Sequence, residues 1–188
     1  MGSSAARLDG TELEALIGSL VRDIADFPQP GVTFKDITPL LDDHLAFTAV
    51  VEALAAAGRD AEGNVVVDKV VGMEARGFIF AAPVALALGV GFVPVRKPGK
   101  LPWQTREVSY DLEYGSETLQ MHLDALAPGE RVLIVDDVLA TGGTARATVE
   151  LIEQGGGVPH ALAVLMELTF LPGRTTVGEL PMTVLHAV

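Results

Sequence analysis

The chain has 188 residues, of which 49% are hydrophobic and 20% are charged, a composition typical of a compact globular protein. Its formal net charge of −12 argues against a nucleic-acid-binding protein, because binding to phosphate backbones needs a basic face. The absence of cysteine excludes disulfides and thiolate metal sites, and no apolar run is long enough to span a bilayer. With no signal-peptide pattern at its start, we expect one domain over residues 1–188 in the cytosol.

The first part of the chain predicts a helix followed by a turn-rich segment. Thr11 and Glu14 have the spacing of a capping box, and apolar residues then recur at helical spacing as far as Ile24. Between Asp26 and Pro39, prolines and a glycine interrupt any helix. Because apolar residues lie around these breakers, we expect a packed, ordered loop.

Strand and helix signals alternate through the remainder of the chain. We expect Asp43 to cap the next helix, and the helix that contains Pro83 to begin late or to kink at that residue. The expected helices cover residues 44–57 and 78–88, and the expected strands cover residues 64–71, 90–95, 132–135, 160–168 and, at a possible sheet edge, 182–188. This alternation, with glycine turns at strand ends, predicts an α/β fold with a doubly wound, mostly parallel sheet flanked by helices.

A long segment, residues 96–123, separates two of the expected core strands. Its first part is turn-rich and basic, and its second part alternates polar and apolar residues about Gly115-Ser116, which predicts a β-hairpin. Loops of this length are uncommon in compact domains unless they have a function. Four of the thirteen basic residues in the chain fall here: Arg96, Lys97, Lys100 and Arg106. The segment therefore fits a small anionic substrate, although a solvated basic loop would show the same charge pattern.

The strongest chemical signal begins at residue 132. Val132–Val135 is a short aliphatic run without alternation, typical of a strand buried on both faces of a parallel sheet. Asp136 and Asp137 follow at once, and carboxylates are costly in apolar surroundings unless they are paired. We therefore expect the strand to end in a polar crevice, which is where open α/β sheets bind ligands.

The next residues, Ala140–Thr144, lead into a helical pattern and are suited to bind a phosphate. Gly142 and Gly143 allow close approach of the backbone, the first helical turn offers free N–H groups, and Thr141 and Thr144 add hydroxyl donors. The loop has neither the lysine of a Walker A motif nor a dinucleotide-binding glycine pattern. A structural turn is the alternative, but two carboxylates beside a phosphate loop predict a site for a ribose 5-phosphate.

These motifs resemble those of a known family. Residues 132–144 are similar, without gaps, to the phosphoribosyl pyrophosphate signature of type I phosphoribosyltransferases. Residues 27–37 resemble the segment that covers the purine in adenine phosphoribosyltransferases, and residues 110–115 resemble the catalytic loop of that family. The turn over residues 72–77 resembles their pyrophosphate turn, with Glu74-Ala75 in place of the usual Asp-Ser. The resemblance runs from residue 27 to about residue 168.

The resemblance implies the type I phosphoribosyltransferase fold, with an N-terminal hood over about residues 1–40 and an inserted flexible hairpin lid over about residues 96–123. It implies transfer of the 5-phosphoribosyl group from phosphoribosyl pyrophosphate to adenine, giving AMP and pyrophosphate in purine salvage. It also implies a homodimer that acts on these small molecules, with no nucleic-acid or membrane partner. Magnesium is expected as the cofactor, held by substrate oxygens rather than by protein ligands.

The resemblance further implies a role for each matching residue. The residues expected to act in catalysis are Glu113 as acid/base, Tyr114 beside it, and Asp136 and Asp137 on the ribose hydroxyls. The residues expected to bind substrates are Arg76, Lys97 and Lys100 at the pyrophosphate, together with Arg96; Phe34 and Val138 on the purine faces; backbone groups of Thr33 and Lys35 at the purine edge; and Ala140, Thr141, Gly142, Gly143 and Thr144 at the 5-phosphate.

Two alternatives to this function are open at this point. The nearer one keeps the chemistry and changes the base to hypoxanthine, guanine or xanthine, against which stands the match over residues 27–37. The other is a non-catalytic regulator that binds phosphoribosyl pyrophosphate as an effector. Such regulators usually carry a DNA-binding domain, and this acidic chain of 188 residues offers little room or charge for one.

Glu113 gives the first testable prediction, because an acid/base role needs an ionisable group that a solvated hairpin charge does not. Glu113→Gln keeps size and hydrogen bonding, and we expect kcat to fall by roughly 10²–10⁴ with little change in substrate affinity. Single-turnover rates measure this step directly. A rate within about twofold of the unmodified protein would show that Glu113 is a solvated charge.

Overall fold

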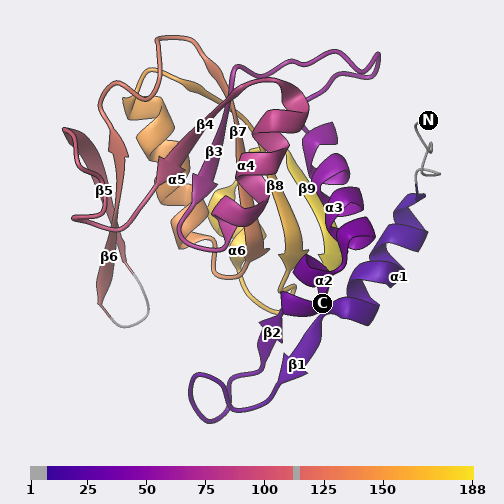
Figure 1. The fold of residues 1–188 in the computed structure, drawn as a ribbon. Coiled ribbons are helices and arrows are strands. Elements are labelled where there is room, and N and C mark those ends of the chain that lie inside the picture. Colours follow the sequence, from indigo (N-terminus) through magenta and orange to yellow (C-terminus); the bar gives the residue numbers. More distant parts are fainter. Residues whose placement is uncertain (1–7, 112–114) are drawn as a thin grey trace.

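The computed structural model describes residues 8–111 and 115–188 of the chain, and its centre is a five-stranded sheet in the order β4-β3-β7-β8-β9 (Figure 1). Every neighbouring pair in this sheet is parallel, which confirms the predicted doubly wound sheet. The strands are β3 Lys69–Met73, β4 Gly91–Val95, β7 Arg131–Leu139, β8 Val158–Glu167 and β9 Met182–Ala187.

Helices cover both faces of the sheet and divide the interior into two apolar clusters. One face carries α1 Gly10–Leu20, α2 Thr38–Asp42, α3 His44–Ala56 and α4 Gly77–Leu88. The other carries α5 Gly143–Gln154 and α6 Gly173–Val177. Because a central strand of such a sheet faces apolar helices on both sides, its residues are buried whichever way they point.

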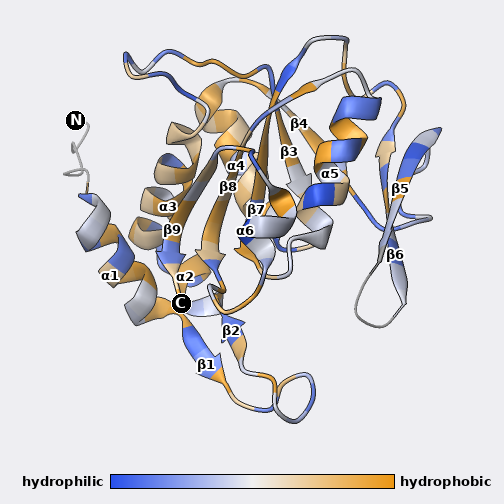
Figure 2. Ribbon diagram, turned by 180° about the vertical axis from the view of Figure 1, so that it is seen from behind, coloured by the Kyte–Doolittle hydropathy of each residue, from blue (hydrophilic) through white to orange (hydrophobic). Residues whose placement is uncertain are grey.

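Strand β7 shows this double burial most clearly. Leu133 and Val135 belong to the cluster under α3 and α4, whereas Val132 and Ile134 belong to the cluster under α5, and all four are fully buried. Figure 2 shows the central strands as predominantly hydrophobic, in agreement with this arrangement. The continuous aliphatic run before the two acids is therefore a strand buried on both faces, as predicted.

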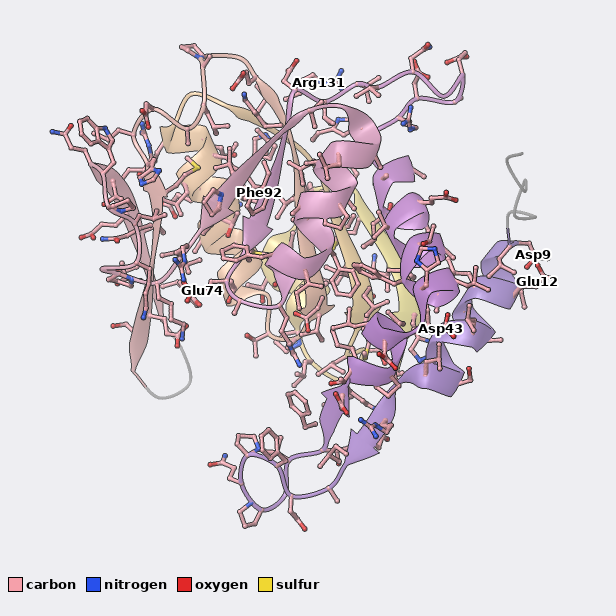
Figure 3. The ribbon with its side chains drawn as sticks, in the orientation of Figure 1. Asp9, Glu12, Asp43, Glu74, Phe92 and Arg131 are labelled. Carbon is pink, nitrogen blue, oxygen red and sulfur yellow. The ribbon has the colours of Figure 1, made fainter. Side chains whose placement is uncertain are left out.

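The start of α3 agrees with the prediction, whereas the start of α1 corrects it. Asp43 caps α3 as expected, since its carboxylate accepts hydrogen bonds from the N–H groups of Leu45 and Ala46. The predicted Thr11–Glu14 capping box is wrong, because Asp9 and Glu12 form it instead and α1 begins at Gly10 (Figure 3). The two pairs have the same spacing, and an aspartate is as good a helix cap as a threonine.

Three further boundaries differ from the sequence expectation. Helix α4 begins at Gly77 and runs through Pro83 to Leu88, rather than beginning late. The β-branched run over residues 64–71 is mostly an approach to the sheet, and β3 is confined to Lys69–Met73. The strand expected over residues 90–95 is β4, which lies at the sheet edge, where Phe92 is partly exposed. A short apolar run does not distinguish an edge from a centre.

Two small antiparallel sheets stand outside the central one. Strands β1 Arg22–Ile24 and β2 Phe34–Asp36 form the first, beyond the carboxyl ends of the core strands (Figure 1). Strands β5 Thr105–Asp111 and β6 Ser116–His122 form the second, which confirms the predicted hairpin. The hairpin packs on α5 by inserting three side chains into the second cluster: Val108, Leu119 and Met121. Among residues 8–111 and 115–188, no helix has both the length and the apolarity needed to cross a membrane.

Candidate active site

A pocket of about 340 Å³ opens at the carboxyl ends of β3 and β7. Parallel strands that are neighbours end at the same edge of a sheet, so the turn after β3 and the loop after β7 lie beside each other. The pocket brings together many of the residues predicted to form the site: Arg76, Asp136, Asp137, Val138, Ala140, Thr141, Gly142 and Thr144. Met73, Glu74, Ala75, Leu139, Ala145, Leu162 and Val164 complete its lining.

Asp136 and Asp137 are unusual in being carboxyl groups enclosed at the end of a core strand. Burial, and then the neighbouring charge of Asp137, raises the pKa of Asp136 well above its ordinary value of 3.8. Burial also raises the pKa of Asp137, although the guanidinium of Arg76 opposes this shift. The Oδ1 of Asp136 accepts the N–H of Asp137 at 2.9 Å. The pair is thus held in place at a cost in stability that a polar ligand would offset.

Arg76 connects this acid pair to the N-terminal hood. Its Nη2 lies 2.8 Å from Oδ2 of Asp137, and its guanidinium lies 4.9 Å from the centre of the Phe34 ring. Phe34 in turn contacts Phe27 edge to face, with ring centroids 5.1 Å apart. The predicted purine-stacking residue and the predicted pyrophosphate arginine are therefore neighbours.

The structure gives steric constraints on the paired glycines of the phosphate loop that the sequence does not show. Gly142 has φ +84°, and a Cβ at this position would lie 2.6 Å from the carbonyl oxygen of Gly173 at the start of α6. A Cβ on Gly143 would lie 2.8 Å from the ring of Tyr110 in β5. Gly142 is thus required by its backbone conformation and by α6, and Gly143 by the close approach of Tyr110, whether or not a phosphate also approaches.

Glu74 organises the basic segment that follows β4. Its carboxylate accepts the N–H of Lys97 at 2.9 Å and the Nε of Arg96 at 3.2 Å. Burial alone would raise the pKa of Glu74, but these hydrogen bonds and the nearby positive charges lower it below its ordinary value. In Figure 3, Glu74 lies between the sheet and the β5–β6 hairpin. The residue that departs from the family pattern therefore ties the pyrophosphate turn to residues 96–97.

Several predicted binding residues lie near the pocket without lining it. The guanidinium of Arg96 is engaged by Glu74 and by the carbonyl oxygen of Lys100, so its contact in this structure is with the protein itself. The Nζ of Lys97 lies 2.8 Å from Oε1 of Glu117. Arg96, Lys97 and Lys100 thus form a basic rim beside the turn after β3.

The hood residues are placed by the β1–β2 pairing. Lys35 lies opposite Asp23, and its Nζ is 2.7 Å from a carboxylate oxygen of that residue, so the ammonium is directed to β1. Thr33 is exposed just before β2, and Phe34 lies opposite Ile24. Their backbone roles at a purine edge stay predictions.

The catalytic-loop prediction is only partly within the described residues. Glu113 and Tyr114 lie outside them, so their assignments stay predictions. The flanking residues are described, and Tyr110 and Glu117 face each other across the hairpin at a hydrogen-bond distance of 3.0 Å. Among residues 8–111 and 115–188, no three His, Cys, Asp or Glu side chains gather as a metal site.

The site matches known proteins in sequence and in structure. Residues 40–167 match the family described as phosphoribosyl transferase domain. The adenine phosphoribosyltransferase of a Nocardioides species is 67% identical over 170 residues, which cover 90% of this chain and 92% of that protein. The chain belongs to the adenine phosphoribosyltransferase family.

Solved structures of adenine phosphoribosyltransferases share the fold over nearly their whole length. The enzyme from Thermoanaerobacter pseudethanolicus has a TM-score of 0.86 at 48% identity, covering 93% of this chain and 99% of that one. The enzyme from Saccharomyces cerevisiae, solved with an imino-altritol bisphosphate and adenine, has a TM-score of 0.87 at 38% identity, covering 93% of this chain and 99% of that one. The predicted type I phosphoribosyltransferase fold is therefore confirmed.

Three residues of this phosphoribosyltransferase site were not assigned a role from the sequence. Tyr110 lies in the motif over residues 110–115 and Glu117 lies in the alternating pattern of the hairpin, and neither pattern gives the residue a function. Glu74 was noted as a departure from the family pattern rather than as a ligand of Arg96 and Lys97. Their contacts cross from one element to another, so only the tertiary structure shows them.

The enclosed acid pair predicts a conflict between stability and activity. Asp136→Asn keeps the hydrogen bond from the N–H of Asp137 and removes a charge that burial disfavours. We expect the free energy of unfolding at pH 7 to rise by about 1 kcal/mol while transferase activity is lost. Urea unfolding of both proteins measures the difference.

The pH dependence of this difference follows from the raised pKa of Asp136. An acid with a raised pKa in the folded state loses stability as pH rises, so the gain in the asparagine variant should vanish as pH falls toward 3.8. Asp23→Asn is the control, because that exposed carboxylate is paired with Lys35 and should change stability by under about 0.5 kcal/mol. A less stable Asp136→Asn protein at pH 7 would contradict the prediction.

Proposed function

We propose that this protein transfers the 5-phosphoribosyl group of phosphoribosyl pyrophosphate to adenine, giving AMP and pyrophosphate, and that it serves purine salvage. The observation that carries the proposal is the single pocket in which the loop before α5, the acid pair and Arg76 meet. Phosphoribosyl pyrophosphate has a 5-phosphate, a diol and a pyrophosphate, and each of these three protein features suits one of them.

The phosphate end is supported by the start of α5. Gly142 is the residue before the helix, and the N–H groups of the first helical turn carry the positive end of the helix dipole. An anion at this position gains both hydrogen bonds and a favourable field without a lysine in the loop. We assign the 5-phosphate to residues 140–144.

The sugar and its leaving group are supported by the pair formed by Asp137 and Arg76. As the anomeric carbon separates from pyrophosphate, positive charge grows on the sugar and negative charge grows on the leaving group. Asp136 and Asp137 would face the first, and Arg76 with Lys97 and Lys100 would face the second. The 2.8 Å contact between Arg76 and Asp137 keeps both charges oriented before the substrate arrives.

The base is supported by the neighbouring hood. Phe34 lies beside Arg76, and Val138 lines the pocket directly after the acid pair, so a purine between them would be close to the anomeric carbon. The Saccharomyces cerevisiae enzyme was solved with adenine, and its likeness to this chain supports the same base here. We assign Glu113 to proton transfer at the purine, with Tyr114 beside it.

Magnesium is proposed as the cofactor, held mainly by oxygen atoms of the substrate. The carboxylates in the described part of the pocket are Glu74, Asp136 and Asp137, and the first is bound to Arg96 while the last is bound to Arg76. Such a donor set fits an ion that keeps most of its ligands from phosphates and water. When bound, the ion would neutralise charge on pyrophosphate.

A homodimer is also proposed, through the exposed face of α4. This helix is apolar around its whole circumference, which is typical of a helix that is buried on all sides. Yet Leu86 is 82% exposed and Ile79, two turns earlier on the same face, is 41% exposed. A second copy of the chain packed on this face would cover both, and the start of the same helix borders the active site.

Base specificity tests the proposed reaction. Stacking accepts any purine, so discrimination must come from hydrogen bonds, and a mismatched donor or acceptor costs a factor of roughly 10² or more in kcat/KM. We expect adenine to exceed guanine, hypoxanthine and xanthine by at least that factor in assays with phosphoribosyl pyrophosphate and magnesium. Comparable turnover of another purine would overturn the adenine assignment and leave the transferase chemistry intact.

Leu86→Glu tests the dimer. A carboxylate in an apolar interface is costly, so we expect the dimer dissociation constant to rise by about 100-fold or more, as measured by light scattering over a concentration series. Phe170→Glu is the matched control, because Phe170 is 75% exposed but lies after β8. A monomeric unmodified protein, or a Leu86→Glu dimer of unchanged affinity, would refute this interface.

A further inference from the structure

Tyr110 in β5 links the hairpin to the loop that we assign to the 5-phosphate. Its hydroxyl oxygen lies 2.9 Å from Oγ1 of Thr144 and 3.0 Å from Oε2 of Glu117. Glu117 lies directly opposite Tyr110 in the β5–β6 register. The ring of Tyr110 rests against Gly143, where a Cβ would come within 2.8 Å of it, so ring packing and hydrogen bonding fix the residue together.

The direction of these hydrogen bonds follows from the number of protons available. The Nζ of Lys97 binds Oε1 of Glu117 at 2.8 Å and lowers the pKa of this glutamate, so Glu117 is a carboxylate and only accepts. Burial raises the pKa of Tyr110, which therefore has one proton at neutral pH and donates it to Glu117. The remaining bond can form only if Thr144 donates its hydroxyl proton to Tyr110.

This arrangement affects what Thr144 can offer to an anion. A threonine hydroxyl has one proton, and here it points toward Tyr110, so the hydroxyl presents only lone pairs to the pocket. A phosphate dianion would be repelled by those lone pairs and would need the proton. Tyr110 could then keep a bond to Thr144 only by withdrawing its own proton from Glu117.

We propose that Tyr110 is a positioning residue that holds the Thr144 hydroxyl proton away from the 5-phosphate, so that phosphate binding and hairpin attachment compete for one proton. The inference rests on the proposed function, in which residues 140–144 receive the 5-phosphate. Binding energy from the phosphate is thereby partly used to rearrange the contact between the loop and the hairpin that carries the predicted catalytic residues.

Tyr110→Phe tests the proposal, because it keeps the ring on Gly143 and removes only the hydroxyl. Thr144 is then free to donate to phosphate, and a hydrogen bond to a charged phosphate is stronger than one between two hydroxyls. We expect the affinity for ribose 5-phosphate, measured by calorimetry, to rise by about fivefold. We expect kcat to fall, because the hairpin loses its hydrogen bond to the loop, whereas a general loosening of the site would weaken both quantities.

Two further variants distinguish an effect of the Thr144 hydroxyl proton from an effect of side-chain packing in the hairpin. Ser109→Ala removes a hydroxyl that pairs with Thr118 at 2.8 Å on the same hairpin but on the opposite face of β5, and it should leave both quantities unchanged. Thr144→Val should weaken ribose 5-phosphate binding. In that background Tyr110→Phe should leave the affinity unchanged, because no Thr144 hydroxyl remains to be released.

The outcomes distinguish this inference from the function on which it rests. Unchanged or weaker ribose 5-phosphate binding by Tyr110→Phe, the same tightening in the Thr144→Val background, or an unchanged kcat would overturn the role of Tyr110. Failure of the unmodified protein to bind ribose 5-phosphate would overturn the assignment of residues 140–144 instead.

Discussion

The structure depends on the parallel pairing of β3 with β7. This register brings Gly72 opposite Val135, so the turn after β3 lies beside the acid pair, which follows Val135 within β7. Arg76 and Asp137 can then meet at 2.8 Å, and the remaining elements of the site are arranged around that contact. A partly buried ion pair contributes little net stability, because desolvation of the enclosed partner offsets most of its attraction. The contact instead orients the two side chains, because it holds the guanidinium of Arg76 against the carboxylate of Asp137 within the pocket.

The β5–β6 hairpin is packed against the core of the protein, although its position in a long insertion predicts a separate, mobile segment. Its apolar side chains are part of the core under α5, and Arg106 reaches the carbonyl oxygens of Gln154 and Leu123. The described strands of the hairpin are packed on α5, and the expected flexibility of residues 96–123 stays a prediction. Polar contacts near the hairpin turn, from Lys97 through Glu117 and Tyr110 to Thr144, are the part that a bound anion can rearrange.

The sequence was informative where chemistry is local and less so where it depends on distant neighbours. The aliphatic run before Asp136 predicted a doubly buried strand, and the cap at Asp43 predicted the start of α3, because both depend on adjacent residues. The edge position of β4 and the partners of Glu74 depend on strand order and on contacts across 22 or 23 residues. The capping error at Thr11 has a different cause, since two acceptable caps were two residues apart and only the backbone conformation selects between them.

The acid pair also couples ligand binding to the exchange of protons with the surrounding buffer. Its carboxyl groups hold protons to a higher pH than free aspartates, because burial disfavours their charged forms. Hydroxyl groups that donate to them favour the charged forms, so under the proposed function the pKa values of Asp136 and Asp137 would fall as the ribose binds. In the pH range where the unliganded pair holds protons, substrate capture would release them, and the heat of binding would then depend on the ionisation enthalpy of the buffer that takes them up. The acid pair can thus exchange protons with the solvent on ligand binding without any opening of the fold.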